Sequence, residues 1–287
     1  MTQPLYEIPG DREQPARMPL WLAICWVIGA GIAAQVLGSF VSGVLRSFLH
    51  SHGARTGELD DTGFVIVPAM MVAAGAMTAA ALIAPSMAGV PLRRALGLTS
   101  APPSCFFAAA LGTVMLGPFA DRLMTEMQRL WPDASLGVLP FLHDLVRQLP
   151  LIAAWPALAL LPGISEELMF RGLLQRAAGT GLRAIALSAG AFALFHIDPH
   201  HVVGVLPLGL FLAWAGSRCG TWVTIFAHVT NNTLAIVAAQ SEALDVGYGS
   251  NAPMPLHWVP PSLALVALAC WLIVRATPKE TELARSH

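Results

Sequence analysis

Charged residues are scarce in this sequence. Asp, Glu, Lys and Arg make up 11% of its 287 residues, and the only lysine is Lys279. A soluble enzyme needs about a quarter of its residues charged to cover its surface, and a disordered or nucleic-acid-binding chain needs more. The net charge of −1 also provides no field that would attract nucleic acid. These three classes of protein are therefore excluded.

Cysteine is scarce as well, with four residues in the chain. They lie far apart, in or beside apolar stretches, and form no C-x-x-C pair. This pattern predicts small hydrophobic core residues. They are Cys25, Cys105, Cys219 and Cys270.

Apolar residues are abundant: 55% of the chain is hydrophobic, and the mean hydropathy is +0.63. A helix needs about 20 apolar residues to cross ~30 Å of hydrocarbon. Eight runs reach or approach this length, so the predicted fold class is all-α, a polytopic membrane bundle of about eight transmembrane helices. The runs cover residues 19–45, 64–90, 105–120, 150–177, 184–198, 202–217, 221–240 and 258–275, of which the third, fifth and sixth are short.

The basic residues predict the orientation of this bundle. If the N-terminus is cytoplasmic and the spans alternate, 11 of the 16 Lys and Arg residues lie on the inner side, as the positive-inside rule requires. We therefore expect both termini in the cytoplasm, with tails at 1–17 and 276–287 around a bundle at 18–275. The wealth of Ala, Gly and Arg is typical of a GC-rich bacterial genome and indicates the bacterial inner (plasma) membrane.

The longest polar stretch between spans runs from Asp121 to Gln148. Its MTEMQRLW pattern is typical of an amphipathic helix at the outer interface. An ordinary connecting loop is an equal alternative.

Three clusters of polar residues lie inside the later spans. An ionisable group inside a span costs at least ~2.5–3.5 kcal/mol, so such groups usually pair or carry function. In the first cluster Glu167 lies four residues before Arg171 on one helix face, and we expect the two to pair. Glu166 points about 100° away and is less well neutralised, as a general base needs to be. The alternative is an interfacial network at a helix end.

The other two clusters contain histidine. His228 and Asn232 are spaced i, i+4 and project from one helix face, whereas Asn231 points about 100° away. Such a pair could hold an anionic oxygen or hydrogen-bond to a neighbouring helix. Considered one at a time, each histidine, including His196 in the fifth span, is more simply a satisfied core residue.

The three clusters are expected at the same depth in the membrane. Glu166, His196 and His228 each lie 10 to 13 residues from a basic residue at the inner end of a span. At ~1.5 Å per residue, all three reach a layer roughly 15–20 Å from those basic residues. Three spans that each place a polar group at this depth predict one buried site.

These residues resemble the CPBP intramembrane proteases, also called the CAAX protease and bacteriocin-processing family, which includes the Rce1-type prenyl-protein endopeptidases. The family pattern E-E-x-x-x-R, F-x-x-x-H, H-x-x-x-N matches this sequence in order and in successive spans. Residues 150–240 are therefore the expected catalytic core, and the first four apolar runs gain their assignment by association. The matching residues are Glu166, Glu167, Arg171, Phe192, His196, His228 and Asn232.

The resemblance implies a catalytic role for four residues. Glu166 would be the base that activates water, and His196 would help to hold or polarise that water. His228 and Asn232 would form the oxyanion-stabilising pair at the scissile carbonyl.

Glu167, Arg171 and Phe192 are implied as supporting residues, of which the first two would orient Glu166. Because the family was long described as metallopeptidases, zinc is the alternative cofactor: two His and one Glu could bind it with an open fourth position. However, the sequence has no H-E-x-x-H, and the Glu167–Arg171 pair adds positive charge that opposes a dication. The favoured mechanism uses glutamate and no cofactor.

A second group of histidines follows His196 in the run His-Ile-Asp-Pro-His-His. Pro199 breaks the i, i+4 helical geometry between His196 and His200, which argues against a second metal site. We therefore interpret His200 and His201 as outer-interface residues.

The expected partners are the lipid bilayer and a membrane-tethered protein or peptide, with no nucleic acid. A bacterial chain has no prenylated CAAX proteins to cut, so that specificity is not carried over. Bacterial relatives are implicated in bacteriocin maturation or self-immunity, and the myxosortases in removal of C-terminal sorting signals. Cleavage near the C-terminus of the substrate is therefore favoured. The alternatives are a non-catalytic peptide-binding or bacteriocin-immunity protein and a small proton-relaying transporter.

Overall fold

The computed structural model describes residues 17–53, 63–241 and 253–277. Within these ranges no strand occurs, and seven helices are long and apolar enough to cross a membrane. An eighth apolar helix, α11 (Leu182–Phe195), is shorter. The predicted all-α bundle of about eight membrane helices is confirmed, while the predicted tails at 1–17 and 276–287 lie almost entirely outside the described residues.

The helices follow the predicted apolar runs closely. Short elements connect them: α4 (Leu92–Ala95), η1 (Pro132–Ala134) and α7 (Val138–Gln148). The long ones are α1 (Leu20–Ser51), α3 (Gly63–Met87), α5 (Pro103–Met115) continued by α6 (Gly117–Leu130), the composite span Leu151–Ala178, α12 (Pro199–Cys219), α13 (Thr221–Ala239) and η4 (Leu256–Trp258) continued by α14 (Val259–Ala276).

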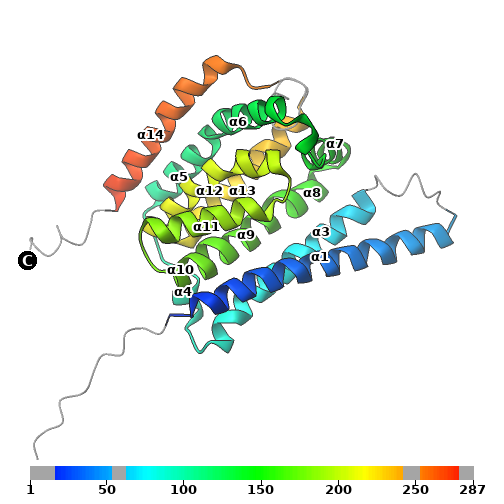
Figure 1. Cartoon of the computed structure of the whole chain (residues 1–287), viewed down its shortest axis with the longest axis horizontal. Coiled ribbons are helices and arrows are strands. Elements are labelled where there is room, and N and C mark those ends of the chain that lie inside the picture. Colours follow the sequence, from blue (N-terminus) through cyan, green and yellow to red (C-terminus); the bar gives the residue numbers. More distant parts are fainter. Residues whose placement is uncertain (1–16, 54–62, 242–252, 278–287) are drawn as a thin grey trace, which may run out of the picture.

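Helices α1 and α3 form an antiparallel hairpin at one side of the bundle (Figure 1). They pack through small residues: a Cβ added to Gly38 would lie 3.3 Å from the carbonyl oxygen of Ala69. Close backbone approach through small side chains is the usual way in which helices pack in lipid. The large apolar side chains of α1 instead face outward about every fourth residue, as expected of a lipid-facing surface. They include Ile28, Ile32, Val36, Phe40, Val44 and Phe48.

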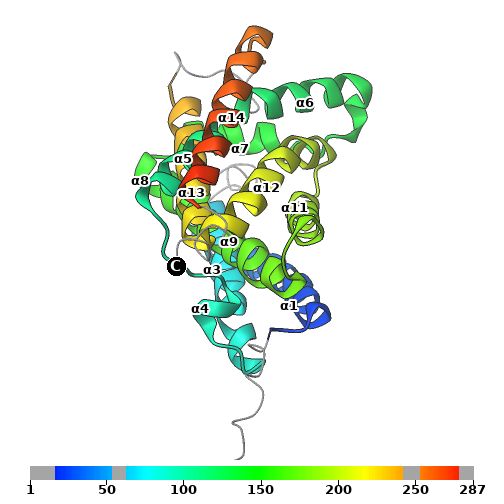
Figure 2. The same cartoon turned by 90° about the vertical axis from the view of Figure 1, so that its left-hand side faces the viewer.

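The polar stretch from Asp121 to Gln148 is mostly helical rather than a loop. It contains α6, which lies across the top of the bundle (Figure 2), and α7. Arg122 and Glu126 pair at 2.8 Å on the partly exposed face of α6, while Met124 is buried on the other. The amphipathic-helix interpretation therefore holds for 117–130 and again for 138–148, with a break at Pro132–Ala134.

The cysteines only partly match the prediction of core residues. All four are free thiols, and Cys105 and Cys219 are buried. Cys270 is half-buried, whereas Cys25 is exposed on α1. The core assignment is therefore wrong for Cys25, because α1 packs against its neighbours through its alanines and leaves its other faces open.

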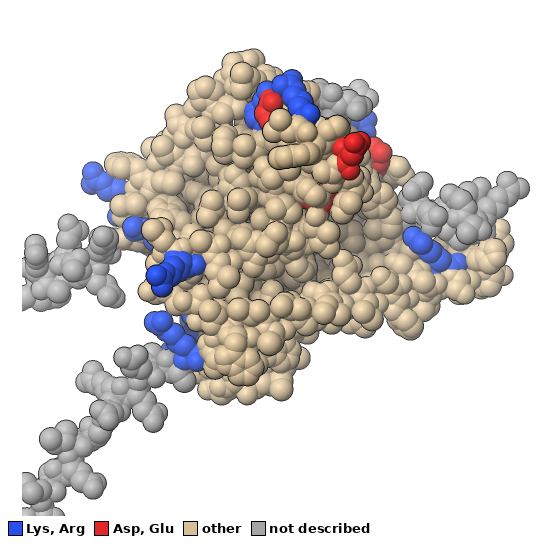
Figure 3. Space-filling view, viewed as in Figure 1, with Lys and Arg blue, Asp and Glu red and all other residues tan. Residues whose placement is uncertain are grey.

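The composite span occupies the middle of the bundle and carries the glutamate cluster. It consists of α8 (Leu151–Ala154), the π-helical η2 (Trp155–Leu160), α9 (Leu161–Glu167), the π-helical η3 (Leu168–Leu174) and α10 (Gln175–Ala178). It contacts α1, α3, α11, α12 and α13 (Figure 1). Much of the outer surface of the bundle carries no charge (Figure 3). Basic side chains gather near the end of the bundle where α1 begins and α10 ends.

Candidate active site

Glu166 and Glu167 lie at the end of α9, between the two π-helical segments. Such segments widen the helix and frequently occur at functional sites. Gly163, one turn earlier, lets this helix approach α13 closely: a Cβ there would lie 2.6 Å from Val229 Cγ2 and 3.2 Å from Val229 N. The glutamates are therefore held directly beside the helix that carries His228.

Glu167 is completely buried and accepts two short hydrogen bonds. Arg171 Nη1 donates to its Oε1 at 2.8 Å, so the pair predicted from the i, i+4 spacing is present. The buried Arg171 also donates from Nη2 to the carbonyl of Gly209 at 3.3 Å and lies over the ring of Phe192, 4.1 Å from its centroid. These contacts fix the guanidinium in place and with it the carboxylate of Glu167.

His228 provides the second hydrogen bond to Glu167 and connects the two carboxylates. Its Nδ1 lies 2.8 Å from Glu167 Oε1, and its Nε2 lies 3.9 Å from Glu166 Oε2. A carboxylate only accepts, so Nδ1 carries the proton and Nε2 faces Glu166. The sequence places Glu167 as a partner of Arg171 and gives no signal for this contact, which joins residues 61 positions apart.

His196 directly follows the last residue of α11 and, like His228, packs against Phe192. Its Nδ1 lies 2.9 Å from the carbonyl oxygen of Phe192, which can only accept, so Nδ1 donates and Nε2 is left as an acceptor. The ring of Phe192 packs edge-on against both His196 and His228, at centroid distances of 4.9 and 5.8 Å. Phe192 thus sets the spacing between the two histidines.

Asn232 lies one turn beyond His228 on α13. Its Nδ2 donates to the carbonyl of Leu158 at 3.4 Å, and its Oδ1 accepts from Asn231 Nδ2 at 3.3 Å. Asn231 therefore reaches the site as well, although helical spacing alone directs it about 100° away.

A cavity of about 320 Å³ joins these residues. Its walls are mainly apolar, including Leu139, Leu142 and Val146 of α7 and Ile236 of α13. The polar residues along it are Glu166, His196, His228, Asn232, Asn231, His201 and His143. The four residues predicted to be catalytic are therefore brought together, and α7, which the sequence shows only as an amphipathic segment, forms part of the wall.

The sequence interprets His200 and His201 as outer-interface residues and does not predict that His201 lines the cavity. His200 is buried and its Nε2 lies 2.9 Å from the carbonyl oxygen of Trp131. His201 lines the cavity, with its ring 4.4 Å from that of His196, and its Nδ1 is buried without a partner among the described residues. Ile197, at a φ of 63°, turns the chain so that the first turn of α12 returns to the site.

Asp198 stabilises this turn. Its Oδ1 accepts from the backbone N–H groups of His200 and His201 at 3.0 and 3.4 Å, and its Oδ2 accepts from Leu136 N at 2.9 Å. Burial alone would raise the pKa of the Asp198 carboxyl, but these backbone donors hold the pKa below its usual range. Asp198 thereby caps α12 and ties it to the segment before α7.

A metal site needs several of these donors to converge on one point. Among residues 17–53, 63–241 and 253–277, no three His, Cys, Asp or Glu side chains have the arrangement that holds a metal ion. The fully buried Arg171 also places a positive charge 2.8 Å from Glu167, the partner of His228, and this charge opposes a dication. In this arrangement the residues do not fit a zinc site of three protein ligands.

The fold and the site define a class of protein: a polytopic membrane protein with a carboxylate, two histidines and an amide around one partly open cavity. Residues 148–234 match the family model described as Type II CAAX prenyl endopeptidase Rce1-like. The match covers less than a third of the chain, and it confirms the resemblance inferred from the motif. The matched segment includes all candidate residues from Glu166 to Asn232. No curated protein and no solved structure matches the chain.

Proposed function

We propose that this protein is an intramembrane endopeptidase that hydrolyses a peptide bond near the C-terminus of a membrane-associated protein or peptide. The observation that carries the proposal is the convergence of Glu166, His196, His228 and Asn232 on one cavity of about 320 Å³. The Rce1-like match over residues 148–234 supports the same reaction class.

Glu166 is the base in this proposal because it retains access to the cavity. Its side chain is 15% exposed, whereas that of Glu167 is 0% exposed and bound to Arg171 and His228. A water molecule between Glu166 and His196 donates one hydrogen bond to the carboxylate of Glu166 and one to Nε2 of His196. One of the two lone pairs of this water attacks the scissile carbonyl carbon as Glu166 takes the proton.

His228 and Asn232 stabilise the oxyanion that this attack produces. With Nδ1 bound to Glu167, His228 donates to the oxyanion only if Nε2 is also protonated, so we assign it the imidazolium form. The charges of the buried groups then balance, because the two negative carboxylates face the positive Arg171 and His228. Asn232 supplies a second donor through Nδ2. Glu166 returns its proton to the leaving amine, which completes hydrolysis.

The proposed mechanism uses no metal and no cofactor. The positive charge of Arg171 beside Glu167 supports this choice, because it opposes a dication at the neighbouring His228. The apolar wall formed by α7 and α13 supports an apolar peptide segment as substrate, because such a wall offers few polar partners. The protein would act within the bacterial inner membrane with both termini in the cytoplasm.

Cleavage of membrane-tethered C-terminal peptides tests the proposal. Purified wild type and Glu166→Gln are compared, each with and without a chelator, and Glu126→Gln on the partly exposed face of α6 is the matched control. We expect cleavage by wild type and Glu126→Gln, with or without chelator, and none by Glu166→Gln. Cleavage by Glu166→Gln would refute the assigned base, and loss on chelation would refute the metal-free mechanism. Peptide capture without cleavage by wild type would favour a non-catalytic binding protein.

A further inference from the structure

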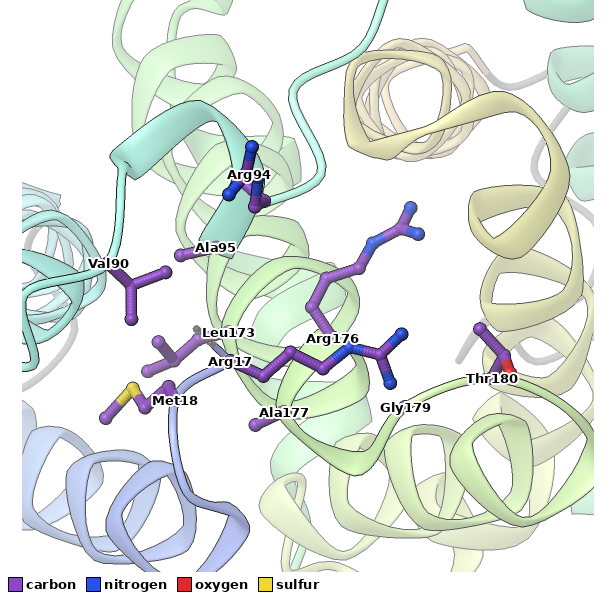
Figure 4. Close-up of a pocket in the computed structure, with 10 residues that line it drawn as sticks. All are labelled: Arg17, Met18, Val90, Arg94, Ala95, Leu173, Arg176, Ala177, Gly179 and Thr180. Carbon is purple, nitrogen blue, oxygen red and sulfur yellow. The ribbon is translucent and has the colours of Figure 1, made fainter. Parts of the chain in front are cut away.

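A second cavity, of about 280 Å³, lies apart from the candidate active site. It is enclosed by the segment before α1, by α4 and by the end of the composite span (Figure 4). Arg17, Arg94 and Arg176 line it, one from each of these elements, and no Asp or Glu does. Three guanidinium groups around one cavity give it a positive potential, which attracts an anion.

Arg176 is held firmly in the wall. Its Nη2 donates to the carbonyl of Gly216 at 2.8 Å, and its guanidinium lies so close to Gly97 that a Cβ there would overlap it. Its Nε is buried and has no hydrogen-bond partner among the described residues. A buried donor left unpaired is costly, which suits a site that is completed by an acceptor.

Arg17 and Arg94 are exposed and less constrained. Arg17 extends toward the turn after α10, where its Nη1 would lie 3.4 Å from a Cβ added to Gly179. Arg94 projects from the short helix α4 (Figure 4). Neither forms an ion pair with a carboxylate within the described part of the chain. Guanidinium groups bind phosphate through paired N–H donors, so these side chains form a fitting set for that anion.

The rest of the cavity is mainly apolar. Its position at the ends of membrane-spanning segments indicates the source of the phosphate. The remaining lining residues are Met18, Val90, Ala95, Leu173, Ala177, Gly179 and Thr180. The cavity lies where α1 begins, shortly after α3 ends, and at the end of α10, so three membrane-spanning segments terminate beside it. Phospholipid phosphates lie at this boundary, next to the first apolar atoms of the acyl chains.

We propose that this cavity binds the phosphate group of an anionic phospholipid. The arginines hold the phosphate, and the apolar lining contacts the adjoining glycerol and acyl carbons. The site does not depend on the proposed hydrolysis, because none of its residues lines the catalytic cavity.

Native mass spectrometry of the detergent-purified full chain, titrated with phosphatidylglycerol or phosphatidylcholine, tests the proposal. The variants are Arg17→Gln and Arg94→Gln, and the matched control is Arg93→Gln, which removes an exposed charge from the same short helix outside the cavity. Each cavity variant should weaken phosphatidylglycerol binding about fivefold, as one arginine near anionic lipid does. Arg176 is left unchanged because it also holds the backbone at Gly216.

We expect wild type and Arg93→Gln to prefer phosphatidylglycerol, and the two cavity variants to lose that preference. Equal weakening in Arg93→Gln would overturn the proposal, since binding would then follow surface charge alone. Inorganic phosphate is the second probe. Displacement of phosphatidylglycerol by phosphate would support the assigned chemistry. Arg94-dependent phosphate binding without any preference for phosphatidylglycerol would overturn the lipid as its source.

Discussion

Replacement of Arg171 by methionine tests the charge balance of the candidate site. Arg171 and Glu167 are 0% exposed and 2.8 Å apart, and His228 contacts the same carboxylate. In Arg171→Met the buried groups would carry one excess negative charge, and in Glu167→Gln one excess positive charge. The double variant restores balance, because Glu166 and protonated His228 then remain as the only charges.

The expected magnitudes follow from this burial. Breaking a buried pair by removing one partner typically costs about 3–5 kcal/mol, whereas replacing the whole pair by neutral groups is often close to neutral. We therefore expect each single variant to lose about 3–5 kcal/mol of unfolding free energy. The double variant should lie within about 2 kcal/mol of wild type, since the amide introduced by Glu167→Gln would still offer a carbonyl oxygen to His228 Nδ1.

Unfolding in bicelles by titration with sodium dodecyl sulfate measures these free energies. The matched control is Arg122→Met, which breaks a pair of the same i, i+4 spacing and the same 2.8 Å distance at a partly exposed position. It should cost no more than about 1 kcal/mol. A double variant no more stable than Arg171→Met alone would refute the charge-balance reasoning and with it the imidazolium form of His228.

Three further predictions concern the surroundings of the site. Gly163→Ala should destabilise the protein by about 1–3 kcal/mol and slow peptide cleavage by up to about 100-fold, because the added Cβ collides with Val229; unchanged kinetics would contradict this. His201→Leu should lower kcat up to about tenfold by removing the ring beside His196, and should lower the free energy of unfolding by no more than the ~0.5–1.5 kcal/mol of one ring contact. The cost stays small because Nδ1 of His201 has no hydrogen-bond partner among the described residues; an unchanged kcat would contradict the prediction. Asp198→Ala should cost about 0.5–2 kcal/mol at pH 7. Since the folded-state pKa of Asp198 is lowered from 3.8, this difference should shrink as the pH falls below about 4; a difference independent of pH would refute it.

The sequence predicts the features that depend on local helical geometry. Runs of apolar residues locate the spans, and the i, i+4 spacing of Glu167 and Arg171 predicts their pairing, because both follow from the rise and period of one helix. The spacing of His228 and Asn232 likewise places both side chains along one cavity.

Features that depend on how distant segments meet were not predictable in this way. The contact between Glu167 and His228 joins two helices and requires their close approach at Gly163. The position of His201 depends on the turn at Ile197 and on the cap provided by Asp198. Pro199 correctly predicts a break between the helix before His196 and the one that follows, but it does not predict the direction in which the chain continues.

Tertiary packing gives the two adjacent glutamates different surroundings. The resemblance implies that Glu167 and Arg171 orient Glu166, yet the hydrogen bonds of Glu167 go to Arg171 and His228. Glu167 is therefore coupled to the proposed oxyanion donor rather than to the proposed base. Glu166, turned about 100° around the helix, keeps its access to the cavity. In the proposed mechanism, Glu167 thus holds the histidine that stabilises the oxyanion, while Glu166 accepts a proton from water.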